Sequence, residues 1–473
     1  MSSGTIVIPP LVWGCIAVQS AWLVWALINF IRRNDEWPVV VAAFLAYCGG
    51  YRFLACSFGF SNWVDLGALF SGKIASGQAG TALALITFGE SVFLVSYRAW
   101  QSTILVVQKQ SLPAVLADRL RWLLIFLTIT CLPIILWTRY YTRQEVEAGK
   151  SLAFQVSSYA QLFPMMAMGL AIFVFLAWRF GALRDFFEKG AAAVLLLVIA
   201  HLTYGPSGRF MFLGWMIGGC YIISTFWFGL KRIPVLAVGA VITLTLFGLA
   251  GAMRNRDQAA TVAAGIERTT TAEDANMLDG LVLLMQVYPE MLPYEYGAGH
   301  LEILERPIPR AWWPGKPAGG YMNKLGIFNT GTAGTVGISP TLFGSFYQEG
   351  GWVAVFILSV IYAWVFARIV RYSCKLRPLF EVLIRACLLG GMIPLLRGGD
   401  LPGVYAWLGM AFWPVLFFLW WNREYLHTGG GNTSGETNRR GRNQKKRALQ
   451  AEAQTAPYSV AAPGKSEMLK TES

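Results

Sequence analysis

Eleven apolar runs, each near the length that crosses a bilayer, constrain this chain more than any other feature of its sequence. A helix needs roughly 20 residues to cross about 30 Å of hydrocarbon. Hydrophobic residues make up 55% of the chain and charged residues only 14%, whereas soluble domains carry about 25% charged residues. We therefore expect an all-α polytopic integral membrane protein with about 11 transmembrane helices. The runs lie near residues 11–31, 38–59, 80–97, 122–138, 160–179, 190–204, 210–229, 233–253, 352–370, 379–396 and 403–421.

The spacing of these runs divides the chain into four parts. Residues 1–253 are expected to hold transmembrane helices 1–8, residues 254–351 a large extracytoplasmic loop with short helices, and residues 352–421 helices 9–11. Residues 422–473 are basic and have few apolar side chains, which predicts a disordered cytoplasmic tail. The first run has no charged segment before it and no small-residue cleavage site after it, so we expect a retained helix.

Basic residues mark every second connection between the runs. This alternation follows the positive-inside rule and predicts an N-out, C-in chain, with the large loop outside. The net charge of +13 is thus a sign of topology, and no nucleic-acid partner is expected. The marking residues are Arg32, Arg33, Arg98, Lys109, Arg119, Arg121, Arg179, Arg184, Lys189, Lys231, Arg232, Arg368, Arg371, Lys375 and Arg377.

The large loop has local patterns of its own. Its residues Ala275–Val287 place apolar side chains at helical spacing, which predicts a surface or re-entrant helix. Six prolines between Pro289 and Pro317 then exclude a long helix. Residues 318–337 are rich in Gly and Thr and are expected to pack as loop on the membrane core.

The cysteines point away from a disulfide framework and from a metal centre. Seven cysteines are scattered along the chain, the large loop has none, and no two form a CxxC pair. Neither a phosphate-binding loop nor a dinucleotide or HExxH motif occurs. No metal and no cofactor is therefore expected.

Ionisable side chains at membrane depth cost about 2.5–3.5 kcal/mol each at a helix centre on insertion scales, so they are candidates for function. Several arginines fall at or near the predicted outer boundary, and a guanidinium binds phosphate oxygens through paired hydrogen bonds. For any single arginine, an interfacial anchor or a structural ion pair is the alternative. Glu90 and His201 are instead expected to be hydrogen-bonded groups that fix helix packing. The predicted phosphate-binding cluster comprises Arg52, Arg209, Arg254, Arg256, Arg306, Arg310, Lys316 and Arg397.

The same loop carries rings and carboxylates that suit a sugar ligand. Trp312, Trp313 and Tyr321 can stack on the apolar faces of sugars, although an interfacial belt explains the two tryptophans equally well. Glu349 and His300 are candidate general bases, because either can take a proton from a hydroxyl within hydrogen-bond reach. Most other loop acids are expected to be solvated.

Three features between about residues 200 and 370 resemble a known family. Gly208-Arg209-Phe210 opens one span, and Arg254 follows the next. Residues 306–317 read Arg-Pro-Ile-Pro-Arg-Ala-Trp-Trp-Pro-Gly-Lys-Pro, and residues 340–351 lead into the following helix. Together these stretches are similar to the oligosaccharide repeat-unit polymerases of bacteria, the Wzy-type O-antigen polymerases.

This resemblance implies a GT-C-like polymerase or ligase architecture and a metal-independent, inverting glycosyl transfer at the outer face of the bacterial cytoplasmic (inner) membrane. The donor would be a growing glycan on undecaprenyl diphosphate, as in O-antigen, capsule or exopolysaccharide synthesis. The acceptor would be a lipid-linked repeat unit, and further partners would be membrane lipid and a chain-length regulator protein. The implied holders of the departing diphosphate are Arg209, Arg254 and Arg310, supported by Arg256, Arg306, Lys316 and Arg397.

Two other functions stay open at this point. A flippase or other transporter of lipid-linked oligosaccharide should show repeated halves, and the sequence halves differ. An O-antigen-ligase-like transferase should carry a His-Asn pair in its outer loop, by analogy with the related ligases, and none is evident.

Overall fold

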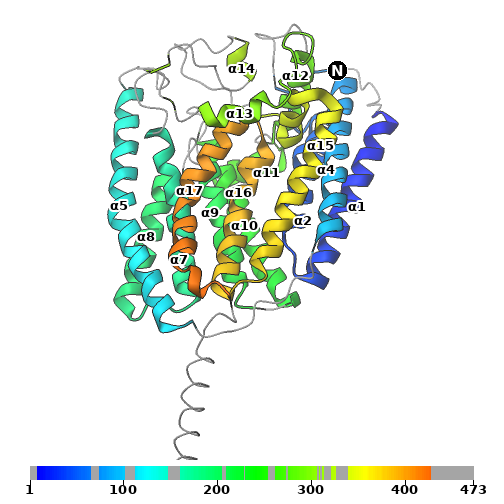
Figure 1. Cartoon of the computed structure of the whole chain (residues 1–473). Coiled ribbons are helices and arrows are strands. Elements are labelled where there is room, and N and C mark those ends of the chain that lie inside the picture. The colour runs from blue at the N-terminus through cyan, green and yellow to red at the C-terminus, as the bar shows by residue number, and fades with distance from the viewer. Residues whose placement is uncertain are drawn as a thin grey trace, which may run out of the picture. The chain divides into compact units, whose positions relative to one another are not determined.

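The computed structural model describes residues 8–64, 74–101, 112–147, 160–204, 209–227, 229–253, 261–272, 275–305, 308, 312–313, 321–325 and 339–427. These residues are mainly helical and contain no strand; an isolated bridge joins Thr341 to Gly398 (Figure 1). They form one compact unit, Met1–Arg423, while the residues from Glu424 onward belong to a second unit. The helices are α1 (Pro10–Arg33), α2 (Trp37–Ala46), η1 (Tyr47–Tyr51), α3 (Arg52–Ser57), α4 (Ser76–Trp100), α5 (Ala114–Glu147), η2 (Ala160–Met165), α7 (Met166–Arg179), α8 (Phe186–Thr203), α9 (Arg209–Ser224), η3 (Gly229–Lys231), α10 (Arg232–Ala252), α11 (Val262–Thr270), α12 (Met277–Val287), α13 (Ala298–Glu305), α14 (Tyr321–Lys324), α15 (Thr341–Ser373), α16 (Pro378–Arg397), α17 (Leu401–Trp421) and η4 (Arg423–Tyr425).

Ten helical segments among the described residues are long and apolar enough to cross a membrane. The all-helical, multi-pass character expected from the sequence is therefore confirmed. One of the eleven expected spans, at residues 210–229, is not among these ten. It corresponds to α9, which is shorter and ends at Ser224. Two arginines bind the chain where α9 ends: Arg232 donates to the Ser224 hydroxyl, and Arg179 donates to the carbonyl of Thr225.

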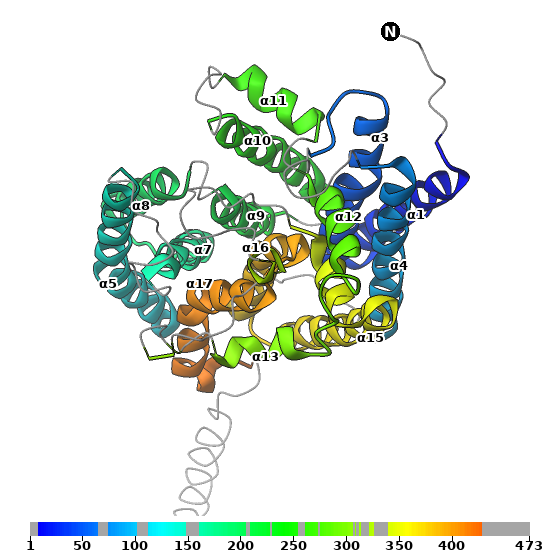
Figure 2. The same ribbon diagram turned by 90° about the horizontal axis from the view of Figure 1, so that it is seen from above.

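Helix α9 lies inside the bundle, where it packs against α7, α10 and α16 (Figure 2). Glycines allow this close approach. A Cβ atom on Gly214 would lie 2.8 Å from the carbonyl oxygen of Gly390, and one on Gly390 would lie 2.8 Å from that of Gly214. Small residues at such crossings are typical of helix pairs in membranes, where packing replaces the hydrophobic effect as the driving force.

Figure 1 shows that α13 and α14 lie at one end of the bundle, which we call the loop end. The last turns of α1 and α17 lie at the opposite end. Prolines in the first turn begin α1, α2, α16 and α17, where a missing N–H costs nothing. Helix α1 ends at Arg33 with Arg32 and Arg33 in its last turn, and the next residue, Asn34, caps it in a left-handed conformation.

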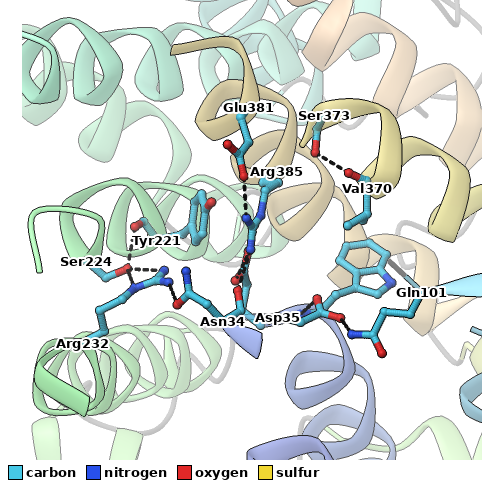
Figure 3. A network of polar contacts seen from close by, with 12 residues as sticks. Asn34, Asp35, Gln101, Tyr221, Ser224, Arg232, Val370, Ser373, Glu381 and Arg385 are labelled. Carbon is cyan, nitrogen blue, oxygen red and sulfur yellow. Dashed lines mark hydrogen bonds and ion pairs between the residues drawn. The ribbon is translucent and has the colours of Figure 1, made fainter. Parts of the chain in front are cut away.

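The short connection between α1 and α2 is held by a buried arginine at the opposite end (Figure 3). Arg385 of α16 donates two hydrogen bonds to Glu36, at 2.6 and 2.8 Å, and one to Glu381 at 2.9 Å. It also donates to the carbonyl of Asn34. Because one guanidinium satisfies two carboxylates and a carbonyl, it fixes the ends of α1, α2 and α16 relative to one another.

Asp35, the middle residue of this connection, is buried, and no ion pair joins it to a cation of the described residues. It accepts hydrogen bonds from the Tyr97 hydroxyl, the Gln101 amide and the backbone N–H of Trp37. Burial, and next the charge of Glu36, raise the pKa of Asp35 from 3.8 to about 7, although Arg385 and the hydrogen bond from Tyr97 oppose the rise. The folded state therefore prefers Asp35 protonated.

This preference predicts a pH dependence of stability. Below about pH 4, Asp35 is protonated in both the folded and the unfolded chain. As pH rises from about 4 to 7, only the folded chain keeps the proton, so the free energy of unfolding should fall by up to about 1.4 kcal/mol per pH unit. Asp35→Asn should remove this part of the slope, measured by denaturant unfolding in detergent between pH 4 and 8, while Asp118→Asn at the surface should keep it. An unchanged slope in Asp35→Asn would contradict the assignment.

Candidate functional site

Much of the predicted phosphate-binding cluster lies outside the described residues. This applies to Arg254, Arg256, Arg306, Arg310 and Lys316, and also to most of residues 318–337 and to the tail from residue 428. Arg209 is the first residue of α9, but its side chain is not among those described. The described part of the chain nevertheless contains a polar site at the loop end.

The two candidate bases, 49 residues apart in sequence, lie in contact. The Nδ1 atom of His300 is 2.7 Å from Oε1 of Glu349, and its Nε2 atom is 3.0 Å from the Tyr362 hydroxyl. Oε2 of Glu349 accepts a 2.6 Å hydrogen bond from the backbone N–H of Gly297. The carboxylate is therefore held at both oxygens and buried, while its partner His300 is only partly exposed.

A break in α15 places Glu349 in this position. The backbone leaves the helical conformation at Gly350 and Gly351, so residues 341–350 form a separate, buried segment before the long span. The sequence placed these residues in the loop, whereas the structure joins them to the bundle. The carbonyls freed near the break accept hydrogen bonds: that of Gln348 from the N–H of Glu295, and that of Glu349 from the N–H of Tyr296.

Glycine is required on the other side of this contact. A Cβ atom on Gly299 would lie 2.6 Å from Oε1 of Glu349 and 2.4 Å from a carboxylate oxygen of Glu295. The absence of a side chain lets the first turn of α13 approach both carboxylates. Both backbone carbonyls and the Glu349 side chain thus join residues 341–349 of α15 to the segment before α13.

Beside Glu349 lies a small pocket of about 10 Å³, room for about one water. Ser345 forms part of its wall and binds the connection between α16 and α17, since its hydroxyl accepts from the N–H of Gly399 at 2.8 Å and donates to the Gly399 carbonyl at 3.1 Å. The lining includes two carboxylates besides that of Glu349, those of Glu302 and Asp400. The lining residues are Gly299, Glu302, Ser345, Gln348, Glu349, Gly399, Asp400, Leu401 and Pro402.

Lys324 of the short helix α14 closes one edge of the site. Its Nζ atom is 2.7 Å from Glu295 and 2.8 Å from Glu302. Burial lowers the pKa of Lys324, but the hydrogen bonds to Glu295 and Glu302 outweigh it, and the net pKa is raised. Lys324 therefore stays charged and ties α14 to the pocket.

Arg52 is buried and bound to protein groups, so it is not positioned to bind a phosphate. Its side chain is 2% exposed, and all five N–H groups donate to protein oxygens. Two go to Asp279, at 2.8 and 3.2 Å, and the others to Ser61, Asn62 and Ala272. These contacts match the alternative considered from the sequence, a structural ion pair.

The Arg52 contacts fix a helical hairpin that runs back into the bundle. Helix α11 packs along α10, with a Cβ on Gly248 only 2.2 Å from the carbonyl oxygen of Gly265. The turn that follows packs Ala272 and Ala275 against Cys48, about halfway along the span Trp37–Ser57. Helix α12 then returns and is buried along nearly its whole length. Of the two alternatives predicted for Ala275–Val287, the structure favours the re-entrant helix.

Arg397 brings the start of α9 and the end of α10 to the same region. Its guanidinium carbon lies 4.1 Å from the centre of the Phe210 ring, and Phe210 packs edge-on against Phe247. Arg209 precedes Phe210, and Arg254 follows soon after α10 ends. Arg397 itself is two residues before Gly399 of the pocket. The start of α9, the end of α10 and the end of α16 therefore lie together near the site.

The aromatic candidates differ in exposure. Trp312 is 82% exposed and Trp313 37%, so both rings are accessible. Tyr321 is 3% exposed, and its ring therefore has no free face for a sugar in this structure.

Glu90 and His201 also depart from expectation. His201 is exposed on α8. Glu90 is buried and Gln19 is nearby, but neither carboxylate oxygen makes a hydrogen bond of ordinary geometry with the described residues.

Sequence reasoning missed several residues of this region. Asp279 carried a signal, since it is the one charged residue of an otherwise apolar helix. Asp400 carried a weaker one, in Arg397-Gly398-Gly399-Asp400. Tyr362 and Lys324 carried none, because only the folded chain brings them to His300 and to the loop carboxylates.

No protein-family model, no curated protein and no solved structure matches this chain.

The buried ion pair predicts a strong stability effect. Asp279→Leu leaves the Arg52 cation buried without its partner and should lower the free energy of unfolding by about 3–5 kcal/mol. The double variant with Arg52→Met removes the stranded charge and should be more stable than Asp279→Leu alone. Denaturant unfolding in detergent measures both. Arg184→Gln, which breaks an exposed ion pair with Asp118, should change stability by less than about 1 kcal/mol. Wild-type stability of Asp279→Leu would show that the pair is not structural.

Proposed function

We propose that this protein is a membrane glycosyltransferase that polymerises oligosaccharide repeat units carried on undecaprenyl diphosphate. The observation that carries the proposal is the buried carboxylate of Glu349, held by His300 and by the N–H of Gly297 at the wall of a pocket that two further carboxylates line. A fixed carboxylate at such a place suits a general base, because base catalysis needs a proton acceptor within reach of one oriented hydroxyl.

In the proposed step, the acceptor's terminal hydroxyl attacks the anomeric carbon of the donor sugar. The new glycosidic bond forms as the bond to the lipid diphosphate breaks on the opposite face, so the configuration inverts. Glu349 takes the hydroxyl proton, and the diphosphate leaves with the electron pair of the broken bond. His300 acts as a positioning residue that orients Glu349. Glu302 and Asp400, which also line the pocket, can accept hydrogen bonds from other sugar hydroxyls.

The departing diphosphate needs positive charge, which lowers the energy of the developing anion. Arg397 and the chain positions of Arg209 and Arg254 support such a cradle, because the end of α16, the start of α9 and the end of α10 lie together. Arg310, with Arg256, Arg306 and Lys316 in support, completes the proposed set from the loop. Arg52 is left out because its donors are bound to Asp279 and its neighbours.

The pocket must widen to admit a sugar, since it now has room for about one water. The segment best placed to move is α14, a four-residue helix held by the ion pairs of Lys324 with Glu295 and Glu302. Sugar hydroxyls can replace the ammonium group as hydrogen-bond partners of Glu302. We propose that displacement of Lys324 accompanies acceptor binding.

The proposed orientation is N-out and C-in, with the loop end at the outer face of the bacterial cytoplasmic membrane. Support comes from basic side chains at the opposite end, such as Arg32, Arg33 and Arg98 in last helical turns. Lipid-linked repeat units presented at the outer face would then reach the Glu349 pocket from the membrane.

A transporter of the same lipid-linked oligosaccharide is the second candidate. It is favoured by two interrupted spans, at the π-helical turn Tyr47–Tyr51 and at Gly350–Gly351, and by the buried carboxylate of Glu90. For transport, Glu90→Gln should block export of repeat units. For polymerisation, Glu90→Gln should leave export intact.

The polymerase proposal predicts a specific glycan profile. A deletion strain should lose the ladder of long chains and accumulate single repeat units on the lipid carrier at the outer face. Glu349→Gln should reproduce this loss, with elongation reduced about 10²–10⁴-fold, the usual contribution of a general base. Arg209→Ala and Arg254→Ala should do the same through the lost cradle, and Glu290→Gln, at an exposed carboxylate of the same loop, should not.

Gel profiles of the glycan and mass spectrometry of the lipid-linked fraction measure these outcomes. Long chains from Glu349→Gln would reject Glu349 as the base. Normal ladders from the deletion strain would reject the polymerase altogether, and repeat units trapped at the inner face would favour the transporter.

The orientation has its own test. In a background with the seven native cysteines replaced by serine, Glu290→Cys should react with a membrane-impermeant maleimide in intact spheroplasts. Arg184→Cys, at an exposed position of the opposite end, should react only after the membrane is permeabilised. The reverse pattern would place the Glu349 pocket in the cytoplasm and exclude the proposed reaction.

A further inference from the structure

A second hollow lies far from the Glu349 pocket, at the opposite end of the bundle beside the last turns of α1 and α4. Its volume is about 190 Å³, against roughly 10–15 Å³ needed for one water. It therefore accommodates a group much larger than a solvent molecule. The lining residues are Trp25, Ile28, Asn29, Arg32, Arg33 and Arg98.

The sequence builds this hollow from one face of a helix. Trp25, Ile28, Asn29 and Arg32 are spaced three, one and three residues apart, so their side chains leave α1 on the same side. Helix α4 lies beside α1 (Figure 2) and contributes Arg98, whose guanidinium carbon is 5.8 Å from the centre of the Trp25 ring. The result is an apolar wall toward the middle of the helices and three cations toward their ends.

The charge in the hollow is of one sign. No carboxylate lines it, and within the described part of the chain none of its three arginines forms an ion pair. The buried arginine at the same end behaves differently, since Arg385 is neutralised by Glu36 and Glu381. The helix dipoles explain one basic residue at each helix end, but they do not explain three cations around a hollow.

Asn29 gives an independent sign of a missing partner. The residue is 7% exposed, and its amide nitrogen has no hydrogen-bond acceptor among the described residues. A buried donor without an acceptor is unfavourable, and its cost is recovered when a ligand supplies an oxygen. Three guanidinium groups and an amide donor around one space match the oxygens of a phosphate group.

We propose that this hollow binds the phosphate of an anionic phospholipid. A lipid is favoured over a soluble phosphate because the same side of the bundle is apolar: Val24, Leu27, Ile28 and Ile31 of α1 are all exposed. Acyl chains can lie along this surface while the phosphate reaches the arginines, as in other basic pockets between membrane helices. The site is independent of the proposed glycosyl transfer.

Native mass spectrometry of the full-length protein in detergent tests this site with phosphatidylglycerol, phosphatidylethanolamine and inorganic phosphate as probes. Phosphatidylglycerol should bind more tightly than phosphatidylethanolamine, whose ammonium group meets the arginines. Arg32→Gln and Arg98→Gln should each weaken phosphatidylglycerol binding about fivefold, the effect of removing one basic side chain near a lipid surface. Asn29→Leu should weaken it about threefold or more, because the donor is lost without a change of charge.

The matched control is Arg368→Gln. Arg368 is also an exposed arginine at this end, with its guanidinium carbon 5.3 Å from the centre of a tryptophan ring, Trp364, but it is not among the residues that line this hollow. It should bind phosphatidylglycerol as the wild type does. Three outcomes would overturn the site: equal binding of the two lipids, wild-type binding of phosphatidylglycerol by Arg98→Gln, or a loss of phosphatidylglycerol binding in Arg368→Gln as large as that in Arg98→Gln. Displacement of the lipid by inorganic phosphate would overturn the lipid as its occupant.

Discussion

Backbone polar groups inside a bilayer must find partners within the protein, and the non-helical parts of this bundle depend on that requirement. The π-helical turn in the second span is satisfied by Gln19, which accepts from the N–H of Gly50 and donates to the carbonyl of Leu45. The turn of the re-entrant hairpin is satisfied by Arg52, through the carbonyl of Ala272. A polar side chain from a distant segment therefore supports each of these two turns.

The ionisable groups follow the same logic but divide into two kinds. The guanidinium groups of Arg52 and Arg385 donate their hydrogen bonds to carboxylates and carbonyls of the protein, so both arginines hold helices together. Glu349 lies at a pocket instead, and the arginines near Trp25 surround a hollow. A charge that is buried and fully paired indicates architecture, whereas a charge fixed beside open space can meet a ligand. This distinction, rather than charge alone, separates the functional candidates from the structural ones.

The sequence predicts the spans well because length and hydropathy are local properties of the chain. It fails where the outcome depends on partners. Residues 341–350 were assigned to the loop, since Gly350 and Gly351 separate them from the next apolar run, but the fold buries them against α4 and α12. Arg52 could not be distinguished from a ligand-binding arginine, because its partner Asp279 is 227 residues away. His300 and Glu349 were identified singly, while their contact became visible only in the fold.

The break at Gly350–Gly351 connects architecture to chemistry. A continuous helix would direct the carbonyls of Gln348 and Glu349 along its own axis, toward the N–H groups of its next turn. The break releases them to the N–H groups of Glu295 and Tyr296 and lets the Glu349 carboxylate reach Gly297 and His300. The segment before α13 is thereby bound through three hydrogen bonds, and α13 itself through a fourth from His300, to residues that line the pocket. A loop attached in this way transmits any movement to the candidate base, so substrate contacts made far out on the loop can control whether Glu349 is oriented to accept a proton.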